Sequence, residues 1–63
     1  MNNPLRFKAW MAENRVKQKD IAELLGISVQ ATFLKVNGKM DFTLAQIKKI
    51  CAKYDISADI FLW

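Results

Sequence analysis

One stretch decides the fold expected for this chain: residues 17–39, KQKDIAELLGISVQATFLKVNGK. Its first apolar residues recur at spacings of three and four, which predicts a helix over residues 18–25. Gly26 stands where a helix ends in a left-handed conformation, and Ser28 is a suitable N-cap for a second helix. This second helix should run to about Val36, where an Asn-Gly pair supplies the turn that ends it. We therefore expect two short helices joined by a tight turn.

The flanking segments carry the same helical signals. Apolar residues at helical spacing predict a helix over residues 4–14, which begins with a proline because proline is tolerated in the first helical turn. Thr43 is a suitable N-cap for a later helix, and a serine can cap a last short helix over residues 58–62. No segment alternates apolar and polar residues over more than a few positions. The expected fold is all-α, a compact bundle of five short helices forming one domain over residues 1–63.

The charge of the chain is distributed unevenly. The 63 residues carry a formal charge of +4, and 52% of them are hydrophobic, which is enough for one core and too much for a disordered basic tail. Residues 1–39 hold seven Lys or Arg against three acids, whereas the remainder holds three of each. A basic excess gathered in this way fits a polyanionic partner and ordinary solubility charge about equally. A membrane surface is disfavoured as that partner, because the lysines do not lie opposite one apolar stripe.

The residue types argue against an enzyme or a metalloprotein. The chain has no histidine and a single cysteine, Cys51, so no thiolate or imidazole metal cluster is expected, and Cys51 is expected to be packed rather than reactive. There is no Gly-rich phosphate loop and no paired-carboxylate motif. No apolar run approaches the roughly 20 residues of a transmembrane helix. We expect a cytoplasmic protein without metal, cofactor, small-molecule substrate or membrane partner.

Four segments carry a resemblance to a known family. They are QKDIAELLGIS (residues 18–28), NGK (37–39), FTLAQIKKI (42–50) and DISADI (55–60). In them the chain resembles the phage Cro and repressor (Xre-type) helix-turn-helix family, over about residues 5–62. The resemblance implies a lambda-repressor-like domain, whose helix-turn-helix is formed by the second and third helices. It also implies a Cro- or repressor-like transcriptional regulator that binds double-stranded operator DNA as a homodimer, inside a bacterial or phage-infected cell.

The resemblance also implies which positions would contact DNA. The residue that begins the second helix would contact a phosphate, the first residues of the third helix would face bases and phosphates, and the loop after that helix would contact phosphates. With the neighbouring positions that the residue chemistry adds, the expected DNA-binding residues are Lys17, Gln18, Ser28, Val29, Gln30, Phe33, Lys35, Asn37 and Lys39. For Gln30, the natural base contact is a bidentate hydrogen bond to adenine N6 and N7.

The start of the second helix suits a phosphate on physical grounds. A helix N-terminus presents unpaired N–H groups and a partial positive charge. Lys17 precedes that helix where Ser, Thr or Asp is the usual cap, and its charge opposes the helix dipole. A docked phosphate would remove this conflict; the alternative is an exposed end without a cap.

The third helix departs from the pattern of its relatives. At about 100° per residue, Val29, Phe33 and Val36 form a good core stripe. The relatives bury instead the positions that are held here by Thr32 and Lys35, which carry a hydroxyl and a charge. The orientation of this helix about its own axis is therefore the open question of the sequence.

Two orientations are compatible with the sequence. In a rotated helix, Phe33 is buried and Lys35 faces outward. In the orientation of the relatives, which we favour, Val29, Phe33 and Leu34 are partly exposed and could pack against thymine methyl groups. Both orientations leave Gln30 outward.

Two further alternatives stay open. The C-terminal residues Phe61, Leu62 and Trp63 are too apolar for a free tail, so they either close the core or form a dimer surface. Apolar side chains exposed on the third helix would also suit a protein interface. A helix-turn-helix protein-interaction module, such as an antitoxin or anti-repressor, is therefore the alternative function.

Overall fold

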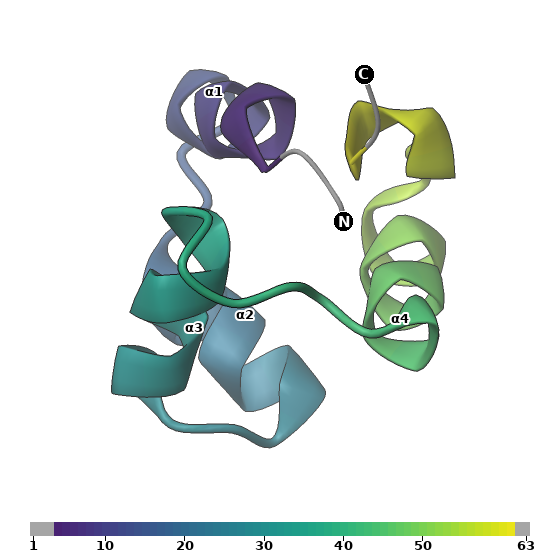
Figure 1. The fold of residues 1–63 in the computed structure, drawn as a ribbon. Coiled ribbons are helices and arrows are strands. Elements are labelled where there is room, and N and C mark those ends of the chain that lie inside the picture. The colour runs from purple at the N-terminus through teal and green to yellow at the C-terminus, as the bar shows by residue number, and fades with distance from the viewer. Residues whose placement is uncertain (1–3, 62–63) are drawn as a thin grey trace.

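Four α-helices and a closing 3-10 turn make up the chain, in a computed structural model that describes residues 4–61 (Figure 1). The elements are α1 (Leu5–Glu13), α2 (Gln18–Leu25), α3 (Val29–Val36), α4 (Leu44–Tyr54) and the 3-10 turn η1 (Ala58–Phe61). Within residues 4–61 there is no β-strand, so the expected all-α class is confirmed. The segment that was expected to form a fifth helix is a single 3-10 turn, and residue 62 lies outside the described residues.

The junction between α2 and α3 follows the local signals in the sequence. Gly26 ends α2 with a φ of 69°, a left-handed conformation that glycine adopts without a steric penalty. Ser28 caps α3, because its Oγ accepts a hydrogen bond from the backbone N–H of Ala31 at 3.0 Å. Thr43 caps α4 in the same way, with Oγ1 3.1 Å from the backbone nitrogen of Gln46. These short-range bonds start α3 and α4 at the residues that the sequence predicted.

The two helices of the junction pack against each other on one side of the molecule (Figure 1). α4 packs against α2 from the other side, and η1 packs against both α4 and α1. The start of α1 contacts the turn after α3: Gly38 in that turn, whose φ is 78°, lies beside the ring of Pro4. Arg6 on α1 donates a hydrogen bond to the backbone carbonyl of Asp59 in η1, at 3.0 Å. α1 thus ties the helix-turn-helix to the C-terminal half.

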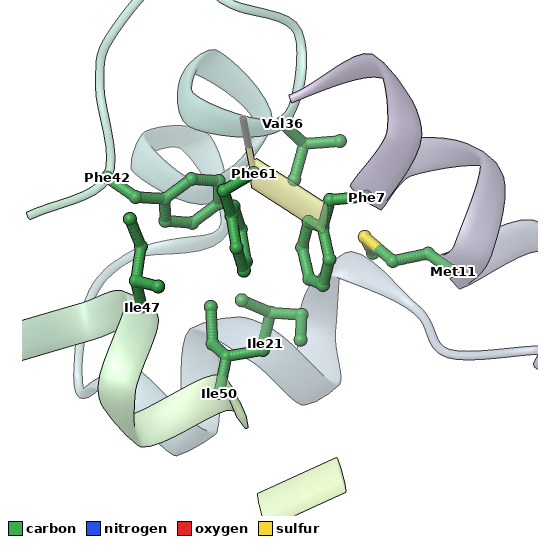
Figure 2. Close-up of a cluster of buried hydrophobic side chains, with 8 residues drawn as sticks. All are labelled: Phe7, Met11, Ile21, Val36, Phe42, Ile47, Ile50 and Phe61. Atoms are coloured by element: carbon green, nitrogen blue, oxygen red, sulfur yellow. The ribbon is translucent and has the colours of Figure 1, made fainter. Parts of the chain in front are cut away.

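Every element contributes to the core. Figure 2 shows eight buried side chains that point toward one another: Phe7, Met11, Ile21, Val36, Phe42, Ile47, Ile50 and Phe61. The rings of Phe7, Phe42 and Phe61 form its centre, with centroid separations of 4.6 to 5.7 Å. Aromatic rings at such separations add about 0.5–1.5 kcal/mol per pair to the burial of their area. Because Phe61 is fully buried here, this residue closes the core; Leu62 and Trp63 lie outside the described residues.

The structure fixes the orientation of α3 as the one that exposes Phe33, which is the orientation favoured from the sequence. Thr32 and Val36 are fully or almost fully buried, and Lys35 is 7% exposed. Val29 and Phe33 are about half exposed, at 51% and 52%. The rotated alternative, which would bury Phe33, is therefore wrong. A buried threonine is tolerated because its Oγ1 donates to the backbone carbonyl of Ser28 at 3.0 Å, so the hydroxyl is not left without a partner.

Two titratable side chains pack at the edge of this core. Burial, with a smaller effect of the Asp59 carboxylate, raises the pKa of the Cys51 thiol, so the unreactive protonated form is favoured. Burial and the Asp20 carboxylate likewise raise the pKa of Tyr54, whose ring lies edge-on to Trp10 at 5.2 Å. Cys51 is therefore a packing residue, as expected. None of the helices within residues 4–61 has both the length and the apolar content needed to cross a bilayer.

Candidate nucleic-acid interface

The start of α2 and the outer face of α3 share one surface. A shallow hollow of about 460 Å³ is lined by Gln18, Val29, Gln30, Phe33 and Leu34. The last four come from α3 and recur at spacings of three and four, so they lie on one face of that helix. Gln18 is the first residue of α2 and joins this face across the junction. Four of the nine residues predicted to bind DNA thus line the same hollow, and Leu34 extends it.

The N-terminus of α2 is only partly capped. Lys17 occupies the N-cap position in an extended conformation, but its side chain has donors only and cannot accept a bond from the helix. Asp20 compensates, since its Oδ2 accepts the backbone N–H of Lys17 at 3.0 Å. The negative charge of Asp20 in the first turn interacts favourably with the helix dipole, and this offsets the unfavourable effect of the Lys17 charge at the same end. The expected conflict at this end is therefore smaller than the sequence suggested; an acid three residues after the N-cap is the signal that would have revealed it.

The first turn of α2 still offers the N–H groups of Gln18 and Lys19 as donors, whereas the N–H of Asp20 donates to the Lys17 carbonyl at 2.9 Å. In any α-helix the N–H groups of the first two residues have no acceptor within the helix. Lys17 and Lys19, which flank Gln18, are exposed. The end of α2 beside the hollow therefore combines N–H donors, an amide and two cations, a set that suits a phosphate oxygen.

The α3 side of the hollow is apolar with polar edges. Val29, Phe33 and Leu34 are exposed at 51%, 52% and 38% of their surface. Gln30 is exposed among them. Ser28 is exposed at the helix start, where its Oγ serves as the cap acceptor and its hydroxyl proton remains available as a donor. This face can make one bidentate hydrogen bond through Gln30 and apolar contact around it.

The turn after α3 is held by an unexpected partner on α1. Lys8 Nζ donates to Asn37 Oδ1 at 2.6 Å, and Asn37 Nδ2 donates to the carbonyl of Phe33 at 2.8 Å. The Asn37 side chain is thus engaged within the protein at both ends and positions the turn. Lys39 follows it with an exposed side chain, while its backbone N–H donates to the carbonyl of Leu34 at 2.8 Å. Lys8 was missed because no short-range pattern in the sequence links residues 29 positions apart.

Lys35 is the predicted site residue that the structure separates from the others. Its Nζ donates to the backbone carbonyl of Asp41 at 2.8 Å and lies 5.9 Å from the centroid of the Phe42 ring. The side chain is 7% exposed, so its charge faces the loop between α3 and α4 instead of the hollow. The prediction that Lys35 contacts DNA does not fit this placement, because the orientation of α3 that exposes Phe33 turns Lys35 inward.

The basic excess of residues 1–39 divides into two groups. Three of its cations are bonded within the protein: Arg6 to η1, Lys8 to Asn37 and Lys35 to the α3–α4 loop. Four others are exposed: Arg15, Lys17, Lys19 and Lys39. Three of these four, all but Arg15, lie at the first turn of α2 or in the loop after α3, beside the helices that line the hollow. Arg6 and Lys8 are exposed as well but bonded, and three further exposed lysines lie on α4.

One comparison with known proteins identifies a family. A family model described as the BetR domain matches residues 6–63, which is nearly the whole chain. This match describes a small helical domain of the helix-turn-helix type, in agreement with the arrangement of α2 and α3. Searches of curated proteins and of solved structures find no match.

Proposed function

The chain belongs to the BetR domain family, and we propose that it is a transcriptional regulator that binds double-stranded DNA at specific sequences. The family match indicates a small helical regulatory domain, and this supports the proposal. The observation that carries it is that the first turn of α2 and the outer face of α3 line one hollow. In a helix-turn-helix protein, these are the parts that meet the phosphate backbone and the major groove.

The contacts divide by chemistry into those that position the protein and those that select a sequence. Gln18, Lys17 and the free N–H groups of α2 would bind one phosphate, and Lys39 would bind another beyond α3. Such contacts fix the orientation of the protein on the duplex without selecting a sequence. Gln30 would select adenine through N6 and N7. Ser28, at the N-terminus of α3, would donate to a base edge or a phosphate.

The proposed action is occupation of a promoter, as in a Cro-type repressor, and needs no catalytic step. One domain of this size makes few base contacts, so useful specificity requires two copies. We therefore propose a homodimer on a palindromic operator, with two α3 helices entering the major groove about 34 Å apart. In this proposal the protein acts by binding and not as an enzyme.

Selection of bound duplexes from a random pool, followed by gel-shift titration across salt concentrations, tests the proposal. We expect enrichment of a palindromic sequence and a steep salt dependence, because each neutralised phosphate steepens the slope of log K against log salt by about 0.9. A flat salt dependence, or no enriched sequence, would contradict it.

Two variants with a matched control separate the two kinds of contact. Gln30→Ala should weaken binding to the selected site about ten-fold and relax the preference at one base pair, which corresponds to a lost bidentate contact. Lys39→Met should weaken binding to all sequences and reduce the salt slope by about 0.9. Lys48→Met removes an exposed lysine from α4 and should change neither quantity. An equal effect of Lys39→Met and Lys48→Met would show that Lys39 makes no local contact.

The exposed apolar face of α3 supports a second candidate function. Val29, Phe33 and Leu34 together would suit a protein interface of the kind used by an antitoxin or anti-repressor. Gln30→Ala and Lys39→Met distinguish the candidates, because they should weaken DNA binding and leave the binding of a protein partner intact.

A further inference from the structure

The hollow on α3 has a chemical character that hydrogen-bond recognition of adenine does not explain. Three of its five lining side chains, Val29, Phe33 and Leu34, are hydrocarbon and stand exposed to solvent. They do not belong to the core cluster, which is complete without them. Something other than packing within the chain must account for their place beside Gln18 and Gln30.

We propose that this hollow binds the C5-methyl groups of pyrimidines in the major groove. The inference rests on the proposed DNA binding and goes beyond it by naming the feature that is recognised. A C5-methyl group is the one apolar feature that a base pair presents in that groove. The occupant must also carry hydrogen-bonding groups and lie near negative charge, because Gln18 and Gln30 line the same hollow. The exposed Lys17 and Lys19 flank Gln18 in the first turn of α2, and the exposed Lys39 follows α3. DNA supplies this combination, with methyl groups at the base edges and phosphates on both sides.

The spacing along α3 predicts where the methyl groups should lie. Phe33 and Leu34 follow Gln30 by three and four residues, which is about 4.5–6 Å along a helix. Successive bases are about 3.4 Å apart along one strand. The methylated pyrimidines should therefore lie one or two base pairs from the adenine that Gln30 contacts.

Thymine and 5-methylcytosine carry the same methyl group at the same place. The hollow itself contacts hydrocarbon and distinguishes a methylated from an unmethylated pyrimidine. The choice between the two methylated bases would come from the polar groups beside the methyl, O4 in thymine and N4–H2 in cytosine.

Base replacement in a duplex selected by the chain tests this inference without altering the protein. Each thymine is replaced in turn by deoxyuridine, which lacks only the methyl group, and T·A pairs are replaced by C·G and by 5-methylcytosine·G. We expect deoxyuridine to weaken binding about four-fold at the contacted positions, the factor for about 0.8 kcal/mol per buried methylene-sized group. 5-Methylcytosine should bind more tightly than cytosine at the same positions. Comparison of the thymine and 5-methylcytosine duplexes then identifies the better source of the methyl group.

A protein variant links the effect to the hollow. In Phe33→Ala/Leu34→Ala, the ratio of affinities for thymine and deoxyuridine duplexes should fall toward one, while circular dichroism shows the helices intact. Leu44→Ala is the matched control, since Leu44 is an exposed leucine of α4 outside the hollow and its loss should leave the ratio unchanged.

The outcomes separate this inference from the proposed function. If a sequence is enriched but deoxyuridine binds as well as thymine at every position, DNA recognition stands and methyl recognition is overturned. A ratio that persists in Phe33→Ala/Leu34→Ala also overturns it, because the methyl group is then contacted elsewhere. If no duplex is enriched, both proposals fail.

Discussion

Substitution of Lys35 and of Lys39 should have opposite consequences, although both lysines lie near the C-terminal end of α3. Lys35 is buried, with Nζ bonded to the Asp41 carbonyl at 2.8 Å, whereas Lys39 is exposed. Methionine keeps an apolar stem of similar length and removes the charge in both cases. Truncation of Lys35 to alanine should therefore lower the free energy of unfolding, and neither Lys35→Ala nor Lys35→Met should change the salt dependence of DNA binding. Lys39→Met should reduce that salt dependence and leave the free energy of unfolding unchanged.

The magnitude for Lys35 follows from its surroundings. Truncation to alanine removes three buried methylenes, worth about 2–3 kcal/mol at ~0.8 kcal/mol each, and one hydrogen bond worth about 1 kcal/mol. Because Asp41 is exposed, water replaces that bond and the total should be about 3 kcal/mol. Lys35→Met keeps the stem packing and loses a bond while relieving a buried charge, so it should stay within about 1 kcal/mol of the parent chain.

Thermal unfolding and gel-shift titration measure the two consequences on the same variants. For a domain of this size, about 3 kcal/mol corresponds to a fall of roughly 12–24 °C in Tm for Lys35→Ala. If Lys35 were a solvated surface residue, its substitution would stay within about 0.5 kcal/mol. A Lys35→Ala variant as stable as the parent chain, or a Lys35→Met variant with the reduced salt slope expected of Lys39→Met, would refute the placement of this side chain.

Three other predictions concern the scaffold. Gly26→Ala should lower the unfolding free energy by about 1 kcal/mol through backbone strain alone, because φ is 69° and no atom lies within 4 Å of the added Cβ; a larger loss in urea denaturation would contradict this. Thr32→Val should cost about 1 kcal/mol by calorimetry, since the hydroxyl donates to the Ser28 carbonyl in a fully buried position, and an unchanged Tm would mean that this bond contributes nothing. Cys51 should react with iodoacetamide at pH 8 more slowly in the folded chain than in urea, because its raised pKa lowers the thiolate fraction; equal rates would contradict the burial of the thiol.

The helix boundaries were predictable because the chain marks them with residues that act locally. Gly26 supplies the left-handed residue after α2, and Ser28 and Thr43 accept N–H groups only three residues away. Each of these bonds forms within one turn of backbone, so a short window of sequence contains all the partners. The start of α2 was predicted incompletely: the Lys17 side chain cannot accept a capping bond, but the Lys17 backbone N–H donates to Asp20 Oδ2 three residues later.

The candidate site was less predictable because its arrangement depends on partners distant in sequence. The bond from Lys8 to Asn37 joins α1 to the end of α3 and cannot be inferred from either segment alone. Lys35 was placed at the interface for its charge, but its acceptor is a backbone carbonyl, a group that every residue carries and that no sequence pattern reveals. The sequence thus predicted which helices form the surface better than which of their side chains face it.

The orientation of α3 depends on both kinds of bond, those within one helical turn and those to residues farther along the chain. Hydrophobic periodicity along the helix favours Phe33 over Thr32 and Lys35 as a core residue. It ranks side chains by hydrophobicity alone and does not consider the hydrogen bonds that buried polar side chains can form. Thr32 and Lys35 can lie inside only because each donates to a backbone carbonyl, one within the helix and one in the following loop. Once those two polar groups are satisfied inside, helical geometry places Phe33 outside. An apolar face that is exposed while polar residues are buried opposite it is not what core packing alone would select. It is the arrangement expected if the outer face of α3 is kept for a ligand with apolar parts, and a methylated pyrimidine edge between phosphates is such a ligand.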